Sequence, residues 1–138
     1  MPVSIQYLSL LFSVASILVA TLTYHRNMRL KRAEWLRSLF EKFYETERYK
    51  AVRFRLDNPE ALQKQGLKEE ILVDYLNFFE FIASLHKIGQ IRKEEVLMLF
   101  RYYLKLIENQ GDIRTCIAEN GFGNLDGLLK DLKKKGKI

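Results

Sequence analysis

The sequence opens with a run that carries no charged side chain from Val3 to Tyr24. These residues outnumber the roughly 20 apolar residues that cross the hydrocarbon core of a bilayer as an α-helix. Basic side chains follow directly, at Arg26, Arg29, Lys31 and Arg32. The pattern predicts a transmembrane helix over residues 1–25. Whatever follows must therefore fold beside a membrane.

The flanks of the run predict its orientation. Tyr7 and Tyr24 are 17 residues apart, about 25 Å along a helix, where interfacial aromatic side chains sit. A cleaved signal peptide fits poorly, because no basic residue precedes the run and no small-x-small cleavage site closes it. The positive-inside rule then places the N-terminus outside the cytoplasm and residues 26–138 inside it.

The small and polar residues of the predicted span are sorted onto one line. They recur at alternating spacings of 3 and 4, which form the a and d positions of a heptad. The line, called the seam below, consists of Gln6, Ser9, Ser13, Ser16, Ala20 and Thr23. Two hypotheses follow: close packing of helices through small residues, or a ring of helices whose hydroxyl groups line a narrow wet pore. A plain membrane anchor is the third.

The remaining residues, about 110, suit one cytoplasmic domain. The lone Cys116 excludes an internal disulfide, in keeping with a reducing compartment. Apolar residues recur with helical period, so the fold class is predicted as all-α. Helices are expected at 27–44 (continuing the span), 45–56, 68–87 and 92–109, then a short helix from 111 and a last one through Leu132. Asp57–Glu60 is predicted as a turn with Pro59 starting a helix, Gly89 as a helix cap, and residues 133–137 as a frayed tail.

No catalytic constellation is present in the sequence. Nucleotide-loop, nucleophile-elbow and zinc-protease motifs are all missing. His25 and His86 are expected at the membrane edge and a helix end, and Cys116 as an inert core thiol. We therefore expect no enzyme activity, no cofactor and no metal site.

Cations and aromatic side chains cluster in two places. In the segment 48–55, Lys50, Arg53 and Phe54 are predicted to share an outward face if Tyr49 and Val52 face the core, and Arg48 and Arg55 flank that face. A weaker cluster consists of Arg101, Tyr102 and Lys105, with Arg114 further along. Cations neutralise phosphates and exposed rings stack on bases, so both clusters are candidate sites for nucleic acid. The alternative is a solvated face beside the anionic membrane, or cations paired with Glu45 and Glu47.

Residues 74–83 (DYLNFFEFIA), followed by 87–91 (KIGQI), Glu94-Glu95 and the earlier Arg32-Ala33-Glu34-Trp35, resemble a family of small bacterial proteins. Its members have one N-terminal span and a helical cytoplasmic domain. The layout resembles the membrane effector of Hailong-type anti-phage defence. Effectors of type III CRISPR signalling, opened by cyclic oligoadenylate, share the general plan.

The resemblance implies a function. It implies a homo-oligomer, with a tetramer as one candidate, in the bacterial inner membrane. Its spans would form an ion channel that is held shut by a nucleic-acid oligomer made by a nucleotidyltransferase partner. A single-stranded or cyclic oligonucleotide is thus the expected ligand. The rival hypothesis is a membrane-tethered scaffold that does not conduct and docks a cytoplasmic protein.

Overall fold

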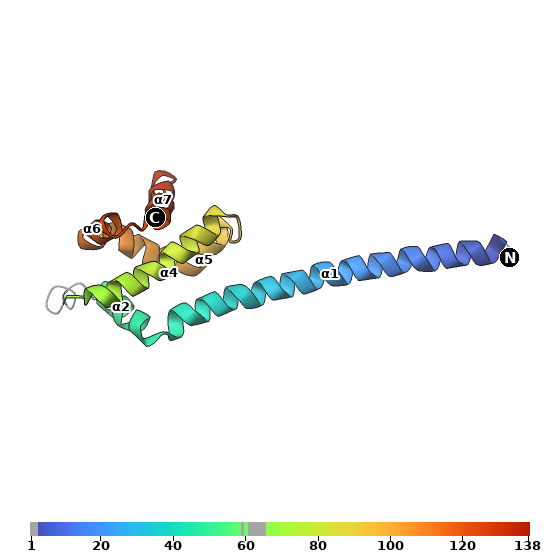
Figure 1. Cartoon of the computed structure of the whole chain (residues 1–138), viewed down its shortest axis with the longest axis horizontal. Helices are drawn as coiled ribbons and strands as arrows, with labels where there is room; N and C mark the ends of the chain where they lie inside the picture. Colours follow the sequence, from blue (N-terminus) through green and yellow to red (C-terminus); the bar gives the residue numbers. More distant parts are fainter. Residues whose placement is uncertain (1–2, 59, 61–65) are drawn as a thin grey trace. The chain divides into compact units, whose positions relative to one another are not determined.

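The computed structural model describes residues 3–58, 60 and 66–138. This part of the chain forms six α-helices and no strand, so the predicted all-α fold is confirmed (Figure 1). The helices are α1 (Val3–Glu45), α2 (Glu47–Asp57), α4 (Glu69–Lys87), α5 (Lys93–Asn109), α6 (Gly111–Glu119) and α7 (Gly123–Lys134). Pro59, predicted to begin a helix, lies outside the described residues. The chain divides into two compact units, Met1–Glu41 and Lys42–Ile138, and we call the second the helical domain.

Helix α1 is continuous from Val3 to Glu45, as expected from a stretch without glycine or proline. Among the described helices, it is the one long and apolar enough to span a membrane, judged by length and composition. None of its apolar window is buried within the chain. It ends because Thr46 adopts an extended backbone, with φ −66° and ψ 116°. The second helix therefore begins at Glu47, two residues later than predicted.

The core of the helical domain is built around the Phe43 ring, which is fully buried in the last turn of α1. Rings from α2, α4 and α5 surround it at centroid distances of 5.1 to 6.3 Å. They belong to Tyr49, Tyr75, Phe78, Phe79, Phe100 and Tyr103. Most of these pairs are tilted or edge-to-face, the geometry that aromatic rings prefer. The helical domain thus includes the end of α1 as a core element.

Two helix ends show how the domain is closed. After α4, Gly89 has φ 76° and the amide of Gln90 donates to Leu85 O at 2.8 Å, so the predicted glycine cap is confirmed. After α7, Gly136 has φ 61° and the amide of Lys137 donates to Leu132 O at 2.9 Å. The expectation of a frayed tail was wrong. The tail after α7 is held by the same kind of hydrogen bond as the turn after α4, and Lys135 Nζ also pairs with Asp131 at 2.8 Å.

Helix α7 has no side-chain cap of its own, since Phe122 occupies the position before it. Glu80 of α4 supplies one instead. Its carboxylate accepts hydrogen bonds from the amides of Asn124 at 3.1 Å and Leu125 at 2.7 Å. A carboxylate at the positive end of a helix dipole is favourable. This contact joins α4 and α7 into one body.

Candidate functional site

The three serine hydroxyls of the seam donate hydrogen bonds within α1. Ser9 Oγ donates to Gln6 O at 2.9 Å, Ser13 Oγ to Ser9 O at 2.9 Å, and Ser16 Oγ to Phe12 O at 2.8 Å. These donors need neither water nor a second helix, so they can lie in an apolar environment at little cost. Pore and packing therefore both stay predictions. The side chains of Phe12, Ala15, Ser16, Val19 and Ala20 leave a shallow hollow of about 430 Å³ along the helix.

Arg53 does not lie on an outward face, and the predicted position of its side chain was wrong. The side chain is 8% exposed. Its guanidinium donates to Phe43 O and, at 3.0 Å, to Tyr44 O. It also stacks over the rings of Phe43 and Tyr44, at 4.8 and 4.9 Å. These carbonyls lie in the last turn of α1, where they lack amide donors from a further turn and carry the negative end of the helix dipole. A buried guanidinium satisfies both, and the Arg53 side chain therefore points inward.

The other cations of the 48–55 segment have partners within the protein. Arg48 faces Asp74 at 3.8 Å, Lys50 pairs with Glu47 at 2.5 Å, and Arg55 donates to Gly66 O. The pairing of Lys50 with Glu47 is what the alternative hypothesis expected. Phe54 remains 64% exposed, so its ring is open to solvent. The segment offers a ligand less free charge than its sequence suggests.

The cluster on α5 is different. Arg101 and Lys105 are exposed and form no ion pair with any described residue. Beside them is a hollow of about 490 Å³, called the α5 hollow below. Residues that line it include Tyr44, Met98, Arg101, Tyr102, Tyr103 and Lys105. The structure therefore brings the two predicted cations together with three tyrosine rings.

Two tyrosines of the α5 hollow, Tyr102 and Tyr103, have a raised pKa. Tyr102 donates from its hydroxyl to Asp57 Oδ1 at 2.7 Å, which ties α5 to the end of α2 and raises the pKa of that hydroxyl. Burial raises the pKa of Tyr103 to about 12, helped by the neighbouring Tyr44 hydroxyl. Planar rings beside two unpaired cations suit a ligand that carries both phosphate and a flat base. Tyr44 was missed because only the fold brings it to the same hollow as Arg101.

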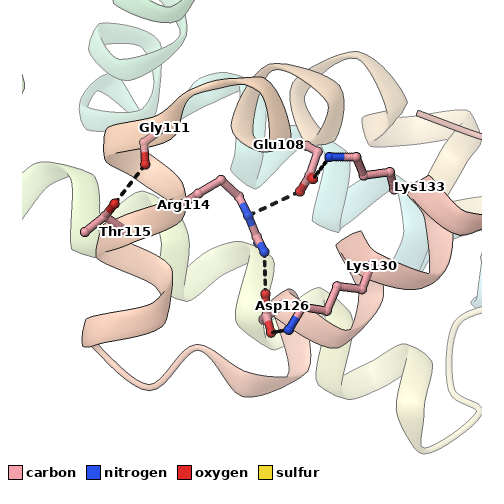
Figure 2. A network of polar contacts seen from close by, with 7 residues as sticks. All are labelled: Glu108, Gly111, Arg114, Thr115, Asp126, Lys130 and Lys133. Carbon is pink, nitrogen blue, oxygen red and sulfur yellow. Dashed lines mark hydrogen bonds and ion pairs between the residues drawn. The ribbon is translucent and has the colours of Figure 1, made fainter.

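Arg114, the outlying member of the second cluster, is engaged elsewhere (Figure 2). Its guanidinium pairs with Glu108 at 3.3 Å and with Asp126 at 2.5 Å. Lys133 and Lys130 complete the network by pairing with Glu108 and Asp126 in turn. The network links α5, α6 and α7, so Arg114 holds the helices of the domain together.

The cysteine and the histidine of the helical domain form no activated site among the described residues. Cys116 is half-buried, and burial raises the pKa of its thiol, the opposite of what an activated nucleophile requires. His86 lies at the end of α4 with Nδ1 3.1 Å from Ile91 O. Within residues 3–58, 60 and 66–138, no group of three or more metal-ligating side chains is placed to hold an ion.

No family model, curated protein or solved structure matches this chain. The resemblance of residues 32–35, 74–83, 87–91 and 94–95 to a family of small bacterial proteins therefore stays a prediction. The α5 hollow is a candidate site because of the geometry of the described residues and their charge.

Proposed function

We propose that this chain is a homo-oligomeric, single-span protein of the bacterial inner membrane, an effector of anti-phage defence that binds an oligonucleotide. In this proposal the N-terminus lies outside the cytoplasm and the helical domain inside it. The α1 helices assemble along the seam and form an ion path. A nucleotide oligomer on the helical domain, supplied by a partner nucleotidyltransferase, controls that path.

The observation that carries the ligand class is the α5 hollow. Arg101 and Lys105 are exposed cations without a partner among the described residues, and Tyr102, which lies between them in sequence, is 57% exposed. Single-stranded nucleic acid is commonly held by such a pairing of cations for the phosphates with rings for the bases. The 48–55 segment supports it less, because Arg53 is buried and Lys50 is paired.

The membrane half of the proposal rests on α1. Its apolar window is unburied within the chain, and the basic residues that follow it favour a cytoplasmic position. Residues 25–41, which follow the apolar run in α1, carry five Lys or Arg against two Asp or Glu, a net +3. A basic segment next to a membrane span attracts anionic headgroups and any polyanion near them.

Oligonucleotide binding tests the ligand. The double variant Arg101→Gln/Lys105→Gln should bind a single-stranded DNA hexamer or oligoadenylate at least tenfold more weakly than the wild type. The slope of its salt dependence should flatten by roughly one unit for each phosphate that the variant no longer neutralises. The matched control is Lys134→Gln/Lys137→Gln, which removes the same charge from the end of α7 and the turn after it, outside the lining of the hollow, and should leave binding within about twofold.

Ion flux tests the effector. Purified protein in liposomes should pass ions, and the oligonucleotide should change that flux in the wild type but not in Arg101→Gln/Lys105→Gln. Protein that binds no oligonucleotide at low salt and passes no ions would contradict the proposal. The tethered scaffold would then be the better description.

A further inference from the structure

Arg53 occupies an unusual position for a cation. Its side chain is buried, and none of the described residues offers it a carboxylate. An arginine cannot give up its charge inside proteins, so burial must be compensated by other groups. Here the compensation comes from the carbonyls of Phe43 and Tyr44 and from the faces of their rings.

The two carbonyls belong to the end of α1. The last carbonyls of a helix lack the amide donors that a continuing helix would provide. They also carry the negative end of the helix dipole, which favours a cation. Arg53 belongs to α2, which follows α1 after the extended residue Thr46. Its guanidinium donates two hydrogen bonds to the last turn of α1. The contact therefore fastens the C-terminal turn of α1 to α2.

The same turn forms a wall of the α5 hollow. Tyr44 lines the hollow, and its ring lies 4.9 Å from the Arg53 guanidinium. Tyr103, also in the lining, has its ring 6.0 Å from that guanidinium and 6.2 Å from the ring of Tyr44. A ligand in the hollow would therefore contact two rings that pack around Arg53.

We propose that Arg53 is a positioning residue that latches the last turn of α1 to α2, and that a ligand in the α5 hollow tightens this latch through Tyr44. The inference rests on the proposed function for its ligand, whereas the latch stands on the described contacts alone. A ligand can bias the end of α1 only if it binds one arrangement of that turn better than another. Tyr44 is the residue through which such a difference reaches α1.

Hydrogen exchange on the detergent-solubilised full chain tests the latch. Arg53→Met keeps most of the side-chain length but removes the charge and both donors. In the wild type, the amides of Thr46, Tyr49 and Lys50 donate to Lys42 O or Thr46 O. Without ligand, these amides should exchange at least tenfold faster in Arg53→Met than in the wild type. Amides of α7 should change less than twofold. Arg48→Met, which removes an exposed charge from the same helix, should leave all of them unchanged.

Arg53→Lys is a second variant that keeps the test decisive if Arg53→Met fails to fold. It keeps the charge but cannot donate to both carbonyls in the planar geometry of a guanidinium, so an intermediate acceleration is expected. Unchanged exchange at residues 46–50 in Arg53→Met would overturn the latch. Equal acceleration over α4, α5 and α7 would also overturn it, because Arg53 would then be an ordinary core residue.

A DNA hexamer tests the link to the α5 hollow. It should slow exchange at residues 44–50 in the wild type, and it should bind Arg53→Met within about threefold without slowing exchange there. Binding without protection in the wild type would overturn the link but leave the proposed function standing. Absence of binding in the wild type would contradict the proposed function and the link together, and the ligand-free comparison would still decide the latch.

Discussion

Burial sets the chemistry of the tyrosine hydroxyls around Arg53. Tyr75 is fully buried on α4, its hydroxyl has no hydrogen-bond partner in the described part of the chain, and desolvation raises its pKa well above the ordinary value. The Arg53 charge acts in the opposite direction on Tyr75 but is the smaller effect. Tyr103 is less buried, and its pKa rises to about 12 for the same main reason. Both hydroxyls stay protonated wherever the domain is folded near neutral pH.

These shifts predict a loss of stability in alkali. The unfolded chain releases the Tyr103 proton near the ordinary tyrosine value of about 10, whereas the folded chain holds it until about 12. Between these values the unfolded state binds fewer protons, so the free energy of unfolding falls as pH rises. Denaturant unfolding of the solubilised chain from about pH 9 to about pH 12 should show this decline. Tyr103→Phe should make it shallower, and an unchanged slope in that variant would contradict the assignment.

At the scale of the helix, glycine has opposite effects at two positions. Gly89 ends α4 with φ 76°, a conformation that costs an ordinary residue about 1 kcal/mol. Gly127 lies inside α7, where glycine is about 0.5–1 kcal/mol worse than alanine. A Cβ at either position would meet no atom within 4 Å. Backbone conformation alone therefore decides what each substitution does.

Alanine at these two glycines should shift stability in opposite directions. Gly89→Ala should destabilise the helical domain by about 1 kcal/mol because the left-handed backbone disfavours a Cβ. Gly127→Ala, the matched control, should stabilise it by a few tenths to about 1 kcal/mol. Urea unfolding followed by circular dichroism measures both. Two shifts of the same sign would show that the turn after α4 relaxes or that the space beside Gly127 matters.

The helices themselves were largely predictable from the sequence. Helix α4 was expected over 68–87 and is found over Glu69–Lys87, because its apolar stripe and the following glycine agree. The position of Arg53 was not predictable, since it depends on where α1 ends and on the two carbonyls there that accept its hydrogen bonds. The α5 hollow was half predictable: Arg101 and Lys105 cluster in the sequence, but Tyr44 joins them only through folding.

For the whole molecule, the pore and packing hypotheses differ in what the seam of α1 faces in an assembly. Ser13 lies near the middle of the proposed span, with Ser9 and Ser16 about one turn to either side. All three hydroxyls bond within α1, so hydrogen bonding does not decide between pore and packing. The two hypotheses differ in whether water reaches these side chains. Leucine at Ser13 would block a wet path but would push apart two closely packed helices.

Thiol labelling makes that difference measurable. In a Cys116→Ser background, which removes the single native cysteine, one cysteine is placed at a time along the span. If the seam lines a pore, a water-soluble thiol reagent should modify positions 9, 13 and 16 but not 10, 12, 14 or 17. Ser13→Leu should then reduce ion flux while the protein still inserts and remains oligomeric. Uniform protection of all seven positions in a preparation that conducts would rule out the pore along this seam, and dissociation of Ser13→Leu in detergent would establish packing in its place.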